Sequence, residues 1–238
     1  MNLKNLSRKK GLIACATIFI AIVVDQIIKI WVKTTMPLGG QIHIADWFYI
    51  KFIENNGMAY GMTFINKPVL SLFRMVLIAL LGWYIVKQVK SKARTFYVLV
   101  LSLVFAGAVG NLIDCMFYGL VFSGSSPFYV SYFVPFGDGY STFLTGRVVD
   151  MFYFPLIVTT WPSWVPVCGG EEFVFFSPIF NFADACISVG FVLLILFCRT
   201  ELSQLSFEGK KKNDNVSGKE RKVRDDDKSD VSEKFAAN

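Results

Sequence analysis

Residues 96–118 read FYVLVLSLVFAGAVGNLIDCMFY, an apolar run that ends on Asn111 and Asp114. A helix needs about 20 apolar residues to cross a hydrocarbon layer of roughly 30 Å. Three more stretches meet this requirement, at 11–32, 69–87 and 179–198. The expected fold class is therefore an all-α membrane protein with four transmembrane helices and a small extracytoplasmic β-sheet. Because a carboxylate in such a span is costly unless it is paired, Asp114 is a functional-site candidate.

The basic residues predict how these helices are oriented. Cations cluster before the first span, between the second and third, and after the fourth, and they account for the formal charge of +6. By the positive-inside rule, both termini are cytoplasmic and the segments 33–68 and 119–178 lie outside. The charge therefore indicates membrane topology and not nucleic-acid binding.

The two outer segments differ in character. Residues 47–53 are rich in aromatic and β-branched side chains and predict a strand of a sheet on the outer membrane surface. Residues 128–134 also alternate like a strand. A connection as long as 119–178 usually has structure or function of its own, such as a lid. We expect one membrane domain over 1–207 and a charged, disordered cytoplasmic tail over 208–238.

A second acidic motif, Phe180-Asn181-Phe182-Ala183-Asp184, begins the last span. The third span runs outward and the fourth runs inward, so Asp114 and Asp184 are expected at similar depths near the outer face. Two adjacent carboxyl groups cannot both ionise easily, which raises one pKa and lets the pair share a proton. One group can then activate water while the other donates a proton. We predict Asp114 and Asp184 as the catalytic pair.

Other polar residues are candidates for supporting roles. Asn111 and Asn181 each precede an aspartate by three residues, so each amide can orient a carboxyl group or only join helices. Asp25 and Lys29 have the i, i+4 spacing of an ion pair, and a role in holding substrate headgroups is the alternative. Arg147 and Asp150 form a further charged pair in the sequence. Asp150 is a competitor for either place in the catalytic pair.

The sequence predicts no metal and no cofactor. His43 is the single histidine and lies in a loop without a nucleophile motif, so we interpret it as an ordinary surface residue. The five cysteines have no ligand spacing and no disulfide pattern. The chemistry proposed for the aspartates requires neither.

Five motifs together give the chain a resemblance to a known family. It resembles the lipoprotein signal peptidases (signal peptidase II), the bacterial inner-membrane aspartic peptidases. The motifs follow the family's order over roughly residues 10 to 200 and are DQIIK at 25–29, NNGMAY at 55–60, GNLID at 110–114, VVDMF at 148–152 and FNFAD at 180–184.

The resemblance implies a substrate and a set of site residues. The substrate is a prolipoprotein whose signal peptide is cut before a cysteine that carries diacylglycerol, and no nucleic acid is involved. It implies Asp114 and Asp184 as the catalytic pair, in a monomer surrounded by phospholipid. The residues that would line or brace the site are Asp25, Lys29, Asn55, Gly57, Asn111 and Asn181.

The chain departs from the family pattern at two places. Cys115 stands where the family has an arginine, and support from that arginine is either lost or supplied elsewhere, for example by Arg147. The stretch between Asp114 and Val148 is also longer than is usual. The longer stretch concerns the shape of the substrate entrance and not the reaction.

Two other functions are open on the sequence. Acids within membrane helices also serve as proton relays in transporters, although four spans without an internal repeat argue against a secondary transporter. Alternatively, the acids only pair with Lys29 and Arg147 in a membrane scaffold without activity.

Overall fold

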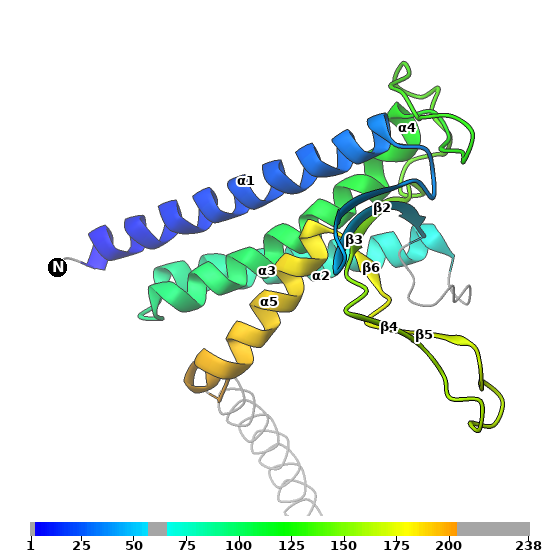
Figure 1. The fold of residues 1–238 in the computed structure, drawn as a ribbon. Coiled ribbons are helices and arrows are strands. Elements are labelled where there is room, and N and C mark those ends of the chain that lie inside the picture. The colour runs from blue at the N-terminus through cyan, green and yellow to red at the C-terminus, as the bar shows by residue number, and fades with distance from the viewer. Residues whose placement is uncertain (1–2, 57–65, 204–238) are drawn as a thin grey trace, which may run out of the picture. The chain divides into compact units, whose positions relative to one another are not determined.

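The computed structural model describes residues 3–56 and 66–203 (Figure 1). The chain falls into two compact units, Met1–Val192 and Leu193–Asn238, and the fold and site below belong to the first. The second contains the end of the last helix and a short helical segment at 199–203. Gly57 and the predicted tail at 208–238 lie outside the described residues.

The described residues form both helices and strands. The helical elements are α1 (Leu3–Thr35), α2 (Lys67–Lys90), α3 (Thr95–Ile113), the π-helical turn η2 (Asp114–Tyr118), α4 (Gly119–Val121) and α5 (Phe182–Phe197). The strands are β1 (Gln41–Ala45), β2 (Phe48–Asn55), β3 (Val148–Tyr153), β4 (Ile157–Thr160), β5 (Glu172–Phe175) and β6 (Ile179–Phe180).

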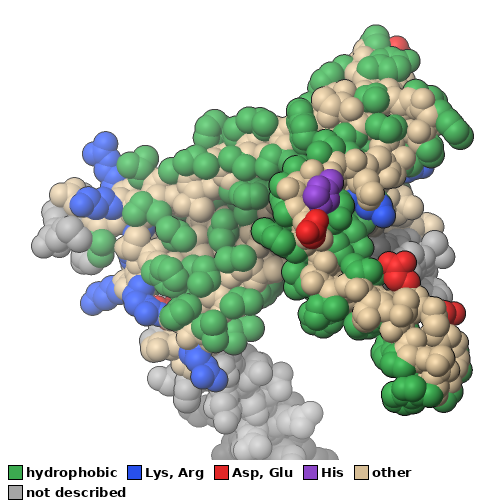
Figure 2. Space-filling model, in the orientation of Figure 1, with side chains coloured by type: hydrophobic (Ala, Val, Ile, Leu, Met, Phe, Trp, Pro, Cys, Tyr) green, Lys and Arg blue, Asp and Glu red, His purple; other side chains and the backbone are tan. Residues whose placement is uncertain are grey.

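Three of the described helical stretches are long and apolar enough to cross a membrane: Asn5–Thr35, Lys67–Lys90 and Thr95–Val121. The fourth apolar helix, Phe182–Phe197, is shorter. It begins later than the predicted span at 179–198 because Ile179 and Phe180 form strand β6 and Asn181 caps the helix. Large apolar side chains such as Phe19, Leu72 and Trp83 lie exposed on the helices, as expected for surfaces that face lipid. Figure 2 shows such side chains spread over this helical layer.

The strands form two sheets. β1, β2, β3 and β6 make a four-stranded antiparallel sheet in that order, and β4 and β5 make a separate hairpin. The strand predicted at 47–53 is confirmed as β2. With two sheets present, the structure does not confirm the all-α part of the expected fold class.

The predicted strand at 128–134 was wrong. Val130 and Phe133 make only isolated bridges, to Pro37 and to Phe122. The segment between α4 and β3 is instead held by loop contacts, such as the bond from the Leu38 backbone N–H to the carbonyl of Ser126. This segment is therefore tied to the end of α1 and not to the edge of the sheet.

A hydrophobic core joins the C-terminal end of α1 to the four-stranded sheet. It is formed by buried side chains from α1, β2, η2, β3 and the segment after α4, which are Val32, Met36, Phe52, Tyr118, Phe122, Val149 and Met151. Alternate residues of a strand point to opposite faces. Because Val149 and Met151 face this core, Asp150 between them faces the other side of β3.

Candidate active site

The packing of α3 against α5 decides where the acidic motifs meet. A Cβ at Gly107 would lie 2.3 Å from the carbonyl oxygen of Ala183, and a Cβ at Gly110 would lie 2.7 Å from Oδ2 of Asp25. Only glycine permits these approaches, as is common between helices in membranes. The first turn of α5 therefore lies directly against α3 and α1.

Two side chains cap the start of α5. The backbone N–H of Asp184 donates to Oδ1 of Asn181 at 2.8 Å, and that of Ala183 donates to Oδ1 of Asp25 at 2.9 Å. The first N–H groups of a helix have no partner within the helix, so these bonds satisfy two of them. Asn181 is thus an N-cap, and the capping places Asp184 on the first turn, where the helix dipole favours a negative charge.

Two hydrogen-bonded amides, those of Asn181 and Asn111, connect the carboxylates of Asp150 and Asp184. Nδ2 of Asn181 donates to Oδ1 of Asp150 at 2.7 Å, and Nδ2 of Asn111 donates to Oδ1 of Asp184 at 2.7 Å. Nδ2 of Asn181 also donates to Oδ1 of Asn111 at 3.1 Å. The asparagines therefore link the motifs across helices and strand. The prediction that each amide lies beside the aspartate of its own motif fails for Asn111, which bonds Asp184.

Asp150 is a buried acid with an altered proton affinity. Its Oδ2 accepts a bond from Nδ2 of Asn55 at 3.2 Å, which confirms that these two motifs meet. Burial, together with the nearby negative charge of Asp184, raises the pKa of Asp150 to about 7. Asp150 and Asp184 therefore interact as two like charges, the condition under which one carboxyl group keeps its proton near neutral pH.

Asp114 has a different environment. It is fully buried, and its Oδ2 lies 2.8 Å from Nζ of Lys29. Its Oδ1 accepts from Nε2 of Gln26 at 3.0 Å, and its Oδ2 also accepts from the backbone N–H of Val149 at 3.3 Å. These bonds tie α3 to α1 and to β3. A carboxylate held in this way is suited to fixing the position of its neighbours.

Lys29 is the centre of this second group. Besides Asp114, Nζ of Lys29 contacts Oδ2 of Asp25 at 2.9 Å, which confirms the predicted ion pair. It also donates to Oδ1 of Asn111 at 2.8 Å. A buried cation is tolerated only when it is paired and hydrogen-bonded. Since Lys29 binds Asn111, it also fixes the amide that holds Asp184.

Arg147 does not pair with Asp150 as the sequence predicted. Its Nη1 lies 3.0 Å from Oε2 of Glu54. Cys115 stands where the family has an arginine. Here a different arginine lies nearby, because Nη1 of Arg74 is 3.7 Å from the Cys115 sulfur. The guanidinium group near this point therefore comes from α2.

Two of these residues, Arg74 and Glu54, carried no signal in the sequence because they stand in ordinary helix or strand positions. Gln26 lies inside the DQIIK motif, but only the fold reveals that it contacts Asp114. His43 lies on the surface as expected, with Nε2 at 3.2 Å from Oδ1 of Asp46. No group of three or more potential metal-ligating side chains occurs within residues 3–56 and 66–203.

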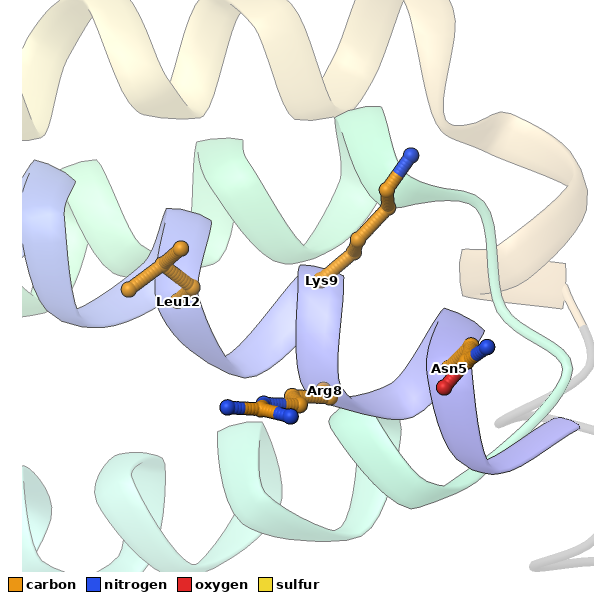
Figure 3. Close-up of a pocket in the computed structure, with 4 residues that line it drawn as sticks. All are labelled: Asn5, Arg8, Lys9 and Leu12. Carbon is orange, nitrogen blue, oxygen red and sulfur yellow. The ribbon is translucent and has the colours of Figure 1, made fainter.

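A pocket elsewhere does not compete with this site. Figure 3 shows a pocket on the first turns of α1, lined by Asn5, Arg8, Lys9 and Leu12. It contains no acidic side chain and lies at the basic end of the helix. This pocket therefore offers no carboxyl pair of the kind that the aspartate cluster contains.

Known proteins similar to this chain share one family. Residues 17–199 match the family model for signal peptidase (SPase) II. The chain is 50% identical over 203 residues to a lipoprotein signal peptidase of Porphyromonas gingivalis strain W83, covering 85% of this chain and 89% of that protein. It is 34% identical over 192 residues to a lipoprotein signal peptidase of Amoebophilus asiaticus, covering 78% and 77%.

The fold also has a counterpart among solved structures. A bacterial membrane enzyme determined by the in meso method superposes with a TM-score of 0.52 at 23% sequence identity, over 77% of this chain and 90% of that one. At this identity the similarity concerns the fold alone. The family match over residues 17–199 and the relative at 50% identity show that the chain belongs to the signal peptidase II family.

Proposed function

We propose that this protein is an aspartic endopeptidase that removes the signal peptide from lipid-modified prolipoproteins, with Asp150 and Asp184 as the reacting pair. Membership of the signal peptidase II family supports the substrate class. The observation that carries the choice of residues is the linkage of the Asp150 and Asp184 carboxyl groups through the amides of Asn181 and Asn111, with the charge of Asp184 acting on Asp150.

This proposal replaces Asp114 by Asp150 as the partner of Asp184. Asp114 already binds Lys29, Gln26 and the Val149 backbone, so it has a structural task. A reacting carboxylate must instead be able to exchange its proton with substrate. Asp184 is only partly buried, and the raised pKa of Asp150 suits a proton donor at neutral pH.

The pair can act through ordinary acid–base steps. Ionised Asp184 takes a proton from water, which attacks the carbonyl carbon of the scissile bond while Asp150 gives its proton to the carbonyl oxygen. The tetrahedral diol then collapses: one hydroxyl returns a proton to Asp150, the C–N bond breaks, and the leaving nitrogen takes the proton from Asp184, which restores both groups. Because the two groups share one proton, their titration belongs to the pair.

The remaining residues hold the pair in place. Asn55 and Asn181 bind Asp150, and Asn111 binds Asp184. Asp25 and Lys29 act through other residues. Asp25 fixes the start of α5, and Lys29 fixes the side chain of Asn111. Positioning of this kind can contribute several orders of magnitude to a rate.

We further propose that α5 completes a four-span topology, with both termini in the cytoplasm of a bacterium and the sheet at the outer face of its inner membrane. In Figure 2, Lys and Arg side chains gather at the end of the helices opposite the sheet. The positive-inside rule makes that end cytoplasmic. The scissile bond of a lipid-anchored precursor lies at the outer interface, the depth at which this topology holds Asp150 and Asp184.

All of these site residues come from one chain, so we propose a monomer within phospholipid as the working unit. The transport alternative is less well supported. In the described helices the acids Asp25, Asp114 and Asp184 gather at one end, whereas a relay requires polar groups along the span.

The test is cleavage of a synthetic precursor by the purified protein in detergent. The wild type should release the signal peptide only when the cysteine carries diacylglycerol, and Asp184→Asn should be inactive on the same peptide. Asp46→Asn, at an exposed surface position, serves as the control. The proposal fails if the wild type leaves the lipidated peptide intact or if Asp184→Asn cleaves it normally.

A further inference from the structure

A second buried ion cluster lies beside the aspartate pair, and the mechanism above does not use it. Nζ of Lys33 is completely buried, forms an ion pair with Oε1 of Glu54 and donates to Oγ of Ser125 at 2.9 Å. It lies 5.0 Å from the ring centre of Tyr140 and 5.3 Å from that of Phe122. Aromatic faces attract a cation most strongly when it is removed from water.

The carboxylate of Glu54 in β2 connects this strand to α1 and to both the middle and the end of the segment 119–147. Its Oε1 receives Lys33 of α1 and, at 2.7 Å, the hydroxyl of Ser125 from the segment 119–147. Its Oε2 receives Nη1 of Arg147 at 3.0 Å, just before β3 begins. Glu54 itself belongs to β2. Burial alone would raise the pKa of Glu54, but the Lys33 charge and these hydrogen bonds lower it overall, so Glu54 stays ionised.

The strand geometry connects this cluster to the candidate active site. In the β2–β3 pairing, Glu54 stands opposite Val149, while Asn55 stands opposite Val148 and Ile53 opposite Asp150. Neighbouring residues of a strand face opposite sides. Glu54 therefore fixes β2 on the core side, and Asn55 reaches Asp150 on the other side.

The bond from Asn55 to Asp150 is sensitive to small movements. At 3.2 Å it is at the long end of the range for an N–H···O bond. A displacement of the β2 end by a few tenths of an ångström would remove it. The ion cluster holds both strands near this bond, because Glu54 is on β2 and Arg147 directly precedes β3.

We infer that Glu54 and Arg147 are positioning residues, and that the long segment 119–147 helps to hold the two strands that carry Asn55 and Asp150. This inference rests on the proposed function, in which Asp150 is a reacting group. It gives the segment, predicted from sequence as a possible lid, a bracing role through Ser125, Phe122 and Tyr140. It also gives Arg147 a partner other than substrate.

The test compares variants of Arg147, whose side chain is 45% exposed, because removing the buried Glu54 charge leaves Lys33 unpaired and endangers folding. In the purified protein, Arg147→Gln should lower kcat about ten-fold while KM changes less than about two-fold, the sign of an interaction that matters in the transition state. Arg147→Lys keeps the charge and should retain most of the activity.

Two further measurements separate positioning from other roles. In the double variant with Asn55→Ala, the Arg147→Gln effect should almost disappear, because both changes remove the same constraint on Asp150. Hydrogen exchange without substrate should be faster in β2 and β3 of Arg147→Gln, and this readout does not depend on cleavage. Faster exchange alongside an inactive wild type would therefore count against the proposed function and not against the bracing cluster.

Three results would overturn the inference. A rise in KM at unchanged kcat would make Arg147 a substrate contact. Full additivity with Asn55→Ala would show that the cluster acts independently of Asp150. Unchanged exchange of β2 and β3 together with wild-type kinetics would show that the strands need no such brace.

Discussion

At the scale of single residues, three aspartates that look alike in the sequence have different partners in the structure. Asp25 caps α5 and binds Lys29, Asp114 binds Lys29 and Gln26, and Asp150 is bound by two neutral amides. Asp25 and Asp114 both contact the buried ammonium group of Lys29, whereas Asp150 lies beside a second carboxylate, a setting in which one of two acids tends to keep a proton. The difference in surroundings is the reason for proposing Asp150 and Asp184 as the acid–base pair.

The pKa of Asp150 gives a pH dependence with a definite sign. Burial and the charge of Asp184 raise that pKa to about 7, and the bond from Asn55 opposes the rise. If protonated Asp150 is the acid, kcat/KM falls as the pH rises through about 7. Removing the Asn55 side chain raises the pKa of Asp150 further. In Asn55→Ala the fall of kcat/KM on the basic side of the pH profile, its basic limb, should therefore move to higher pH.

The measurement is a pH profile of kcat/KM for the wild type and for Asn55→Ala. Asn56→Ala is the matched control, because Asn56 accepts a bond from Lys67 and not from the aspartates. Its basic limb should coincide with that of the wild type. A limb in Asn55→Ala that stays in place, or that moves to lower pH, would contradict the role given to this bond.

At the scale of elements, periodicity and length predict the helices well and their junctions poorly. The long apolar runs appear as α1, α2 and α3, and the aromatic stretch at 47–53 appears as β2. The start of α5 was placed too early, because a β-bridge to β3 and the capping by Asn181 depend on tertiary contacts. The pairing of Asn111 with Asp184 follows from the close packing of α3 and α5, which no local pattern encodes.

That close packing depends on Gly107. A methyl group there would lie 2.3 Å from the Ala183 carbonyl oxygen and 2.8 Å from Cγ1 of Ile187. Since backbone cannot move aside easily, Gly107→Ala should push α5 away from α3, destabilise the protein by about 1–3 kcal/mol and reduce cleavage. Thermal unfolding and the lipopeptide assay measure the two effects.

Gly11→Ala on α1 provides the control. Its new methyl group would meet only Cγ1 of Val89, at the ordinary contact distance of 3.7 Å. Alanine favours helix over glycine by about 1 kcal/mol, so this variant should be as stable as the wild type or more so. Equal stability of the Gly107 and Gly11 variants would show that α3 and α5 tolerate a wider separation.

At the scale of the whole molecule, the proposed topology puts the sheet and the hairpin β4–β5 outside the cell membrane. Cys168 lies between β4 and β5 and has a free thiol. A membrane-impermeant maleimide should therefore label it in right-side-out membrane vesicles and leave it unlabelled in sealed inverted vesicles. Cys168→Ser identifies the labelled position, and labelling confined to inverted vesicles would reverse the topology.

The sequence motifs were sufficient to predict the family, and the family membership is confirmed by the match over residues 17–199. They were not sufficient to choose between Asp114 and Asp150. Both aspartates follow apolar runs and precede apolar residues, and the choice depends on Lys29, which reaches Asp114 from another helix. The buried Lys33–Glu54 cluster was missed for the same reason, since its members are far apart in the chain.

The most direct test of the account compares Asp150→Asn with Asp114→Asn in one assay. Cleavage of a lipidated precursor and thermal unfolding are measured on the same purified samples. Asp150→Asn should abolish cleavage while the unfolding temperature stays at or above that of the wild type, because it removes a buried acid that repels Asp184. Asp114→Asn should lower the unfolding temperature, because Lys29 loses a buried partner. Substantial turnover by a folded Asp150→Asn protein, or complete loss in Asp114→Asn at unchanged stability, would contradict the assignment.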